Sequence, residues 1–182
     1  AFATKSLSPP TRRKSLLTMG CRNCIDVLII VLQSYFLWSC IAIERHYCHQ
    51  PLSADSTGIL KTTYEYAIEN NRLFASRPDY MVMATCISAY GLGTLYALVL
   101  LAFTFKWNWI RMIAILLVGA KAYALGFYHL MEFTSDTPPE NLLAYWGPEF
   151  PYILSLVLLL ARTLPGPPFQ AVTQQVKPTK ED

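Results

Sequence analysis

Charged residues are scarce in this sequence of 182 residues. Asp, Glu, Lys and Arg make up 15% of it, whereas they make up about 25% of an ordinary soluble domain. Hydrophobic residues make up 53%. This balance argues against a water-soluble protein. Because the basic residues do not gather into one patch or stripe, it also argues against nucleic acid as a partner.

Motifs with an assigned chemistry are also missing. The sequence contains no G-x-S-x-G, P-loop or H-E-x-x-H pattern. Cys21 and Cys24 form a C-x-x-C without a second pair, and His46, Cys48 and His49 follow the first apolar block. Structural zinc sites take four Cys or His ligands. We therefore expect no metal, and we interpret the His/Cys group as a polar cap at the membrane interface.

The sequence is instead dominated by four long apolar blocks. A helix needs about 20 mostly apolar residues to cross a hydrocarbon core about 30 Å thick. Buried helices of a soluble protein show shorter, amphipathic stripes. We therefore predict an all-α integral membrane protein, a bundle of four transmembrane helices with an amphipathic helix in the first connection. The blocks span residues 24–43, 80–105, 109–133 and 141–161.

The charges between the blocks predict the orientation of the bundle. Residues 1–23 and 106–111 carry basic residues and no acidic ones, whereas residues 134–140 carry Asp136 and Glu140 and no base. The positive-inside rule then places both termini on one side of the membrane. We name it the basic side, and the opposite one the acidic side.

The first connection, residues 44–79, is too long to be a simple turn. Its middle predicts a short helix that lies over the mouth of the bundle or in the interface plane. Ser56 or Thr57 is the expected N-cap. The expected apolar strip consists of Ile59, Leu60, Thr63, Ala67 and Ile68.

The two ends differ in composition from the predicted membrane domain, residues 24–164. Residues 1–23 are basic and rich in Ser and Thr, as in an organellar transit region or the residues after its cleavage; a start at Met19 is the alternative. Residues 165–182 are Pro-rich and polar. Neither end can bury enough apolar surface to fold alone. We therefore expect both to be ordered by other subunits of a membrane complex.

Polar groups inside the blocks are the candidate site. Lys121 lies about 15 Å into the third span from the basic side, and Glu149 lies about 12 Å into the fourth from the acidic side. Because these depths nearly coincide, we expect the two to pair directly or through water, either to lock helix packing or as a ligand or proton site. Gly147, Pro148 and Pro151 are expected to disturb the helix around Glu149 and free carbonyls.

Three further acid or imidazole groups are candidates near the acidic side. His129 and Glu132 end the third block, and Glu44 ends the first. Together they would form a different site, but sequence alone does not fix their geometry.

Several segments resemble the EXPERA family, of sigma-2 receptor and emopamil-binding protein type. The resemblance covers residues 24–164. It rests on four spans with a long helical first connection, "NWIR" at residues 108–111 and "FPYILSLVLLL" at residues 150–160. It implies a four- or five-helix bundle with a sterol-sized pocket. Glu44 matches the acidic residue that ends the family's first span, and "YAIE" at residues 66–69 matches part of its connecting helix.

The chain departs from this family in the second span. The family's acidic residue there falls on Ile87, and its glutamine falls on Gly91. The histidine that the family's isomerases need has no counterpart in the span. Proton transfer to a sterol double bond requires a positioned acid and base, so we expect no sterol double-bond isomerisation.

Three functional hypotheses follow. The first is a non-catalytic accessory subunit of a multi-subunit organellar complex, such as a respiratory complex of the mitochondrial inner membrane. The second is a stand-alone sterol- or lipid-binding protein of the endoplasmic reticulum membrane. The third is a sterol isomerase-like enzyme. The expected partners are membrane lipids and other subunits, with no cofactor other than a bound lipid or sterol.

Overall fold

The computed structural model describes the backbone of residues 12–169 and the side chains of residues 23–169. Within this range all regular elements are helical. Four of the helical segments are long and apolar enough to cross a membrane, which confirms the predicted all-α membrane fold. They are Asn23–His49, Asp79–Phe105, Asn108–Phe133 and Leu142–Thr163.

Spans one and two share an uncommon construction, because each contains one turn of π-helix between two α-helical parts. The π-turns pack against each other, and the Cys40 thiol donates to the Ser88 carbonyl at 3.8 Å. Single π-turns inside α-helices are rare and occur mostly at functional sites. Span one consists of α1 (Arg12–Ser39), η1 (Cys40–Glu44) and α2 (Arg45–His49), and span two of α5 (Asp79–Ile87), η2 (Ser88–Leu92) and α6 (Gly93–Phe105).

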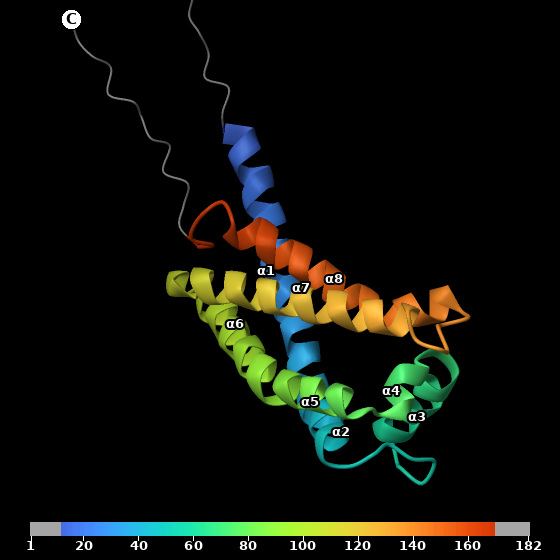
Figure 1. Ribbon diagram of the computed structural model, residues 1–182. Helices are drawn as coiled ribbons and strands as arrows, with labels where there is room; N and C mark the ends of the chain where they lie inside the picture. Colours follow the sequence, from blue (N-terminus) through green and yellow to red (C-terminus); the bar gives the residue numbers. More distant parts are fainter. Residues whose placement is uncertain (1–11, 170–182) are drawn as a thin grey trace, which may run out of the picture.

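Spans three and four are simpler. A short 3-10 turn, η3 (Asn108–Ile110), leads into α7 (Arg111–Phe133), and α8 (Leu142–Thr163) forms the last span. Figure 1 shows α7 and α8 lying side by side. Helix α1 packs against α6 and α8, and α6 packs against α7. The four spans therefore enclose one interior.

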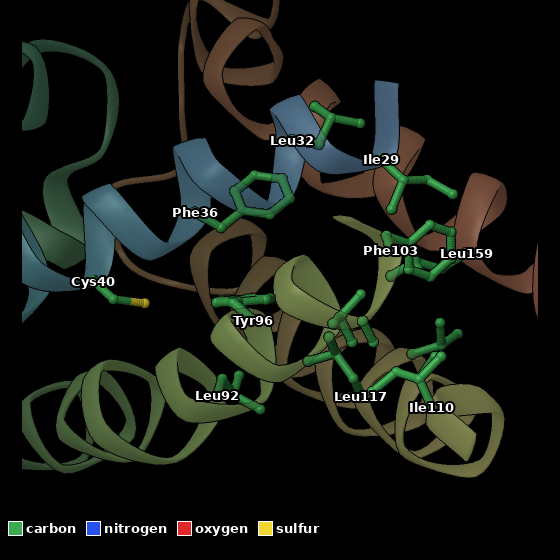
Figure 2. Packing of buried hydrophobic residues seen from close by; sticks show 14 residues of the cluster. Ile29, Leu32, Phe36, Cys40, Leu92, Tyr96, Phe103, Ile110, Leu117 and Leu159 are labelled. Atoms are coloured by element: carbon green, nitrogen blue, oxygen red, sulfur yellow. The ribbon is translucent and has the colours of Figure 1, made fainter. Parts of the chain in front are cut away.

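The bundle interior is apolar toward the basic side. Figure 2 shows the cluster there, to which all four spans contribute. Many large apolar side chains point outward instead, including Met112 and Tyr123 of α7, which are 69% and 76% exposed. Outward apolar side chains are costly in water but suit hydrocarbon. The apolar interior and the apolar outer surface both therefore fit a protein surrounded by lipid.

Two arginines fasten the basic end of the bundle. Arg111 donates to the carbonyls of Thr163 and Leu164 at 3.0 and 3.1 Å, so a cation caps the C-terminus of α8, where the helix dipole favours positive charge. Arg162 forms a bidentate ion pair with Asp26, with nitrogen–oxygen distances of 2.6 and 3.0 Å. Spans one, three and four are thereby tied together.

The expectation that both ends contact other subunits lies mostly outside the described residues. Helix α1 already begins at Arg12, inside the predicted basic extension. At the other end, the Phe169 amide donates to Asn108 at 2.9 Å, and the Phe169 ring packs on Phe103. The first residues of the predicted tail therefore pack on this chain's own bundle. Residues 1–11 and 170–182 lie outside the described part of the chain.

A disulfide joins spans one and two on the acidic side, between Cys48 and Cys86. The sequence placed Cys48 at the interface but did not predict this bond, because the two cysteines are 38 residues apart and belong to no motif. Disulfides form and persist in oxidising compartments. The acidic side therefore fits an oxidising compartment.

Reducing the disulfide is expected to lower the free energy of unfolding by about 3–4 kcal/mol, because it releases a closed loop of roughly 40 residues in the unfolded chain. Thermal unfolding of a Cys48→Ser variant in detergent measures this. Cys40→Ser is the matched control, since Cys40 is a free, buried thiol. Equal unfolding midpoints for the two variants would contradict the expectation.

The first connection contains two helices, α3 (Ile59–Asn70) and α4 (Arg72–Ser76). The predicted cap was wrong: α3 begins after Gly58, at φ 59°, without a side-chain cap. The apolar strip is only partly buried, since Ala67 is buried while Ile59 and Ile68 are exposed. Asn71 lies between the two helices in sequence, and its side chain accepts a hydrogen bond from the Phe74 amide at 3.2 Å. Figure 1 places both helices at the acidic end of α7 and α8.

Candidate functional site

Polar side chains follow the inner faces of α7 and α8 at helical spacing. On α7, Lys121, His129 and Glu132 recur at intervals of two turns and one turn. On α8, Glu149 is followed one turn later by Tyr152. Residues three or four apart lie on one face of a helix. Two polar stripes therefore run along the seam between neighbouring spans.

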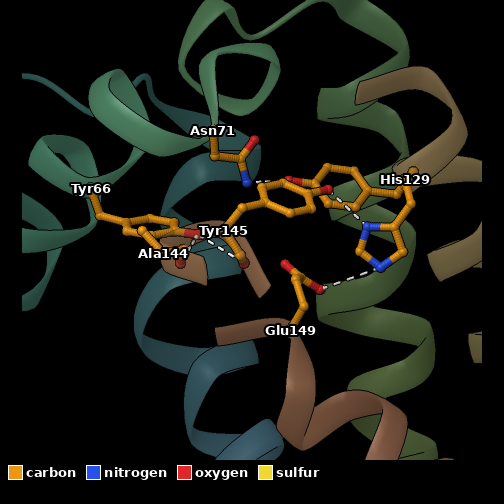
Figure 3. Close-up of polar contacts among 7 residues, drawn as sticks. Tyr66, Asn71, His129, Ala144, Tyr145 and Glu149 are labelled. Atoms are coloured by element: carbon orange, nitrogen blue, oxygen red, sulfur yellow. Dashed lines mark hydrogen bonds and ion pairs between the residues drawn. The ribbon is translucent and has the colours of Figure 1, made fainter. Parts of the chain in front are cut away.

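The stripes meet at the acidic side in a group that we name the acidic-side cluster: His129, Glu132, Tyr145 and Glu149. The His129 Nδ1 and Tyr145 Oη atoms lie 2.8 Å apart. The His129 Nε2 and Glu149 Oε2 atoms are 3.9 Å apart, which is an ion-pair distance when His129 is protonated but too long for a hydrogen bond. Figure 3 shows the imidazole between the phenol and the carboxylate. The cluster joins α7 to α8.

Glu132 has the most unusual surroundings in the cluster. It is 0% exposed, and neither of its carboxylate oxygens has a hydrogen-bond partner among the described residues. The Leu73 backbone amide of α4 is close enough to interact with the Glu132 carboxylate, but it does not reach the geometry of a hydrogen bond. A buried polar group without a partner costs about 1–3 kcal/mol, and more when it is charged. Glu132 therefore lacks the donors that a buried carboxylate needs.

Helices α3 and α4 cover the cluster, as Figure 3 shows. The Tyr66 hydroxyl of α3 donates to the carbonyls of Ala144 and Tyr145, at 3.4 and 3.3 Å. Asn71 donates to the Tyr128 hydroxyl. These bonds hold α3 and α4, which we name the cover, on the ends of α7 and α8.

One proline explains where the cover binds. Pro148 and Pro151 lie inside α8, which continues through both. Proline has no amide hydrogen, so Pro148 leaves the Ala144 carbonyl without its donor four residues on. The expectation of a freed carbonyl is confirmed at Ala144, since Tyr66 donates to it from α3. The prolines do not break the helix, since α8 runs from Leu142 to Thr163 through both of them.

The Tyr66 hydroxyl is suited to this donation at any physiological pH. Burial, and to a lesser extent the negative charges of Glu149 and Glu132, raise the pKa of Tyr66 to about 12. Because the folded state holds the proton more tightly than an unfolded chain, with an ordinary pKa near 10, this bond stabilises the fold below pH 10. The stabilisation is lost as the pH rises toward 12.

Replacing Tyr66 by phenylalanine is expected to cost about 1 kcal/mol, the usual net value of one hydrogen bond. It should expose α3 to limited proteolysis, whereas Tyr64→Phe, on the same helix, should not, since Tyr64 has no side-chain hydrogen bond among the described residues. In a Pro148→Ala background, which restores the α8 donor, the effect should shrink. An undiminished effect there would contradict the assigned role of the Ala144 carbonyl.

Lys121 lies deeper, near the middle of the bundle. It is 9% exposed, and its ammonium nitrogen lies 4.3 Å from the ring centroid of Tyr152 and 6.0 Å from that of Tyr96. Cation–π contacts of this kind contribute about 2 kcal/mol when desolvated. No hydrogen bond or ion pair of Lys121 occurs within the described residues. The aromatic rings are thus its direct partners.

The expected contact between Lys121 and Glu149 is not a direct one. In the described part of the chain Lys121 and Glu149 form no direct ion pair, because Lys121 lies over Tyr152, one turn further along α8, while Glu149 approaches His129. Equal depth placed the two groups in one layer but did not fix their directions around the helices. Pairing through water stays a prediction. Glu44 lies apart from the cluster at the end of η1, where it accepts from the Cys40 thiol at 3.5 Å.

Other members of the site were not predicted from the sequence. Tyr145 is fully buried and lies within hydrogen-bond distance of His129, but in the sequence it is one of several aromatic residues near the ends of the apolar blocks. Gln33 and Ser155 form a buried hydrogen bond of 2.8 Å between α1 and α8. The Ala144 carbonyl is the member of the site that the sequence could have indicated, because it precedes Pro148 by four residues and therefore lacks a helical donor.

The described residues contain no group of three or more His, Cys, Asp or Glu side chains that could hold a metal ion. No family model, curated protein or solved structure matches the chain. The chemistry of the site therefore rests on its own groups. The acidic-side cluster offers carboxylates and an imidazole as acceptors, and Trp146 and Phe133 form an aromatic wall, with the Trp146 and His129 rings 4.7 Å apart. Hydrogen-bond acceptors and aromatic faces thus lie side by side at this end of the bundle.

Proposed function

We propose that this chain is a non-catalytic membrane protein that binds a lipid-like amphiphile. The polar group of the ligand is a hydrogen-bond donor, a protonated amine or a hydroxyl, and it lies at the acidic-side cluster. The observation that carries this proposal is Glu132, a fully buried carboxylate with two unpartnered oxygens. Buried polar groups in proteins are hydrogen-bonded, and buried charges are paired; a donor group of a ligand would supply what Glu132 lacks.

The surroundings of Glu132 support an amphiphile over a water-soluble ligand. The cluster lies inside a bundle whose outer surface is apolar, so a ligand can reach it from lipid. Trp146, Phe133 and Tyr145 offer aromatic faces beside the carboxylates, and such faces attract cations and apolar groups alike. The resemblance to the EXPERA family, with its sterol-sized pocket, favours the same class of ligand.

The composition of the second span supports binding without catalysis. From Tyr80 to Phe105 it contains no histidine and no carboxylate, and Ile87, at the family's acidic position, is 63% exposed and points outward. A sterol isomerase would need an acid and a base on facing sides of the substrate. The acidic-side cluster supplies these groups from α7 and α8 only, which lie side by side.

A Glu132→Gln variant tests the proposal. Long-chain alkylamines and a sterol should raise the unfolding temperature of the purified wild type in detergent, whereas a fatty acid should not. The variant should bind the amine at least about tenfold more weakly, a loss of about 1.4 kcal/mol. Without ligand it should be more stable than the wild type, because a binding site is often built at the expense of stability.

Glu140→Gln is the matched control. Glu140 lies on the surface, where its side chain is 79% exposed and pairs with Arg72 at 3.2 Å, so this variant should bind as the wild type does. The proposal would be contradicted if only the fatty acid stabilised the wild type, or if the Glu132→Gln and Glu140→Gln variants bound the amine equally well.

The membrane in which the protein works is a separate proposal. The disulfide favours an orientation in which the acidic side faces an oxidising compartment such as the lumen of the endoplasmic reticulum. The alternative, an accessory subunit of a mitochondrial inner-membrane complex, stays a prediction. It depends on the two ends of the chain, most of which lie outside the described residues.

A further inference from the structure

Several buried polar atoms in the bundle interior have no hydrogen-bond partner among the described residues. On α1 and α6 they are Oε1 of Gln33, which is 0% exposed, and the hydroxyl of Tyr96, which is 3% exposed. On α7 they are Nε2 of His129 and both oxygens of Glu132. In folded proteins such atoms are commonly bonded by buried water, which typically makes about three hydrogen bonds each.

These atoms belong to one connected seam. Gln33 bonds Ser155, which lies one turn from Tyr152 on α8. The Tyr152 ring faces the Lys121 ammonium, which also lies over Tyr96. In this half of the seam, which lies nearer mid-membrane, consecutive residues either face each other across helices or lie one turn apart on the same helix.

The seam continues toward the acidic side in the same manner. Glu149 precedes Tyr152 by three residues on α8. It approaches His129 at 3.9 Å, and Glu132 follows His129 by three residues on α7. From Tyr145 to Ser155 the seam extends about 15 Å along α8, which is about half of a hydrocarbon core.

The seam ends at an apolar layer. One turn nearer the basic side, each contributing helix places a buried aliphatic side chain: Ile29 before Gln33, Leu117 before Lys121, Leu159 after Ser155 and Val99 after Tyr96. These four residues are 0–1% exposed and belong to the cluster in Figure 2. Apolar cavities exclude water. The layer therefore separates the seam from the Asp26–Arg162 pair.

We propose that this seam is a hydrated half-channel. Water, and with it protons from the acidic-side compartment, reaches Lys121 and Gln33 in mid-membrane and stops at the layer formed by Ile29, Val99, Leu117 and Leu159. The path begins beneath the cover, next to Glu132. This inference goes beyond lipid binding and does not depend on it, since the deeper part of the seam lies about three turns of α7 from Glu132. It assigns the bundle a one-sided aqueous access.

Cysteine accessibility tests the half-channel. Ser155→Cys and Leu159→Cys lie one turn apart on α8, on either side of the proposed boundary. Each is introduced with Cys21, Cys24 and Cys40 replaced by serine, while the disulfide is kept. A small, membrane-impermeant, positively charged methanethiosulfonate is applied to each side of proteoliposomes. Orientation is assigned with Lys61→Cys on the acidic side and Lys106→Cys on the basic side, both exposed.

The Ser155→Cys variant should react from the acidic side more than an order of magnitude faster than from the basic side. It should also react that much faster than the Leu159→Cys variant from either side. Equally slow reaction of the two variants, or faster reaction of Ser155→Cys from the basic side, overturns the half-channel. If the Ser155→Cys variant does not fold, Gln33→Cys and Ile29→Cys on α1 give the same comparison and decide it.

Discussion

Replacing Arg162 by methionine is expected to lower the free energy of unfolding by about 3–5 kcal/mol. Arg162 is 8% exposed and holds both carboxylate oxygens of Asp26. Without the guanidinium, Asp26 keeps a partly buried charge with no opposite charge beside it. The loss should appear as a lower midpoint when the protein is titrated with a denaturing detergent in mixed micelles.

Two controls separate the pair from other effects of the substitution. Lys106→Met, at an exposed basic-side residue, should leave the midpoint unchanged. A double variant, Asp26→Leu with Arg162→Met, should recover most of the loss, because replacing both members of a buried pair by apolar groups is often neutral. A double variant as unstable as Arg162→Met alone would contradict the assigned cause.

Replacing Phe36 by alanine is the second change with a large expected effect, a loss of about 3–5 kcal/mol. Phe36 is 2% exposed, stacks on Tyr152 at 4.3 Å and lies 5.5 Å from Tyr96. These are the two rings on which Lys121 rests. The cavity would therefore remove packing and loosen the aromatic support of a buried cation.

Trp38→Ala on the same span is the matched control. Trp38 is a larger aromatic residue, but it is 46% exposed on the outer surface, where lipid can fill the space that it leaves. Its unfolding midpoint should stay close to that of the wild type in the same micelles. An equal loss for both variants would show that Phe36 is not a packing centre.

The fold was predictable because membrane-spanning helices leave a strong signal in sequence. Four apolar blocks of sufficient length fixed the number and approximate bounds of the spans, and the charges between them indicated their orientation. The structure confirms four spans. It also shows the π-turns η1 (Cys40–Glu44) and η2 (Ser88–Leu92), which no residue pattern predicted.

The site was predictable in depth but not in direction. Rise per residue placed Lys121 and Glu149 in one layer, yet the position of each side chain around its helix decides its partner. Lys121 faces Tyr152, and Glu149 faces His129. His129 and Glu132 were candidates by residue type alone. They lie one turn apart on α7, and the packing of α7 against α8 places Tyr145 and Glu149 beside them.

The disulfide and the half-channel could not be predicted from the sequence for the same reason. Cys48 and Cys86 lie far apart in sequence, and the packing of α2 against α5 and of η1 against η2 brings them together. Similarly, Gln33 and Ser155 are unremarkable polar residues within apolar blocks until α1 and α8 place them opposite each other. Long-range contacts of this kind depend on helix rotation, which a hydropathy pattern does not determine.

Imaging the native ligand tests the central claim most directly. The protein is extracted from its own membrane into lipid nanodiscs without added ligand, and its density map is determined by electron cryomicroscopy. We predict a non-protein density beneath the cover, with its polar end within hydrogen-bond distance of Glu132 and His129 and its body along α7 and α8. A map in which Glu132 bonds only to protein donors, with no such density beside it, would contradict the proposed function.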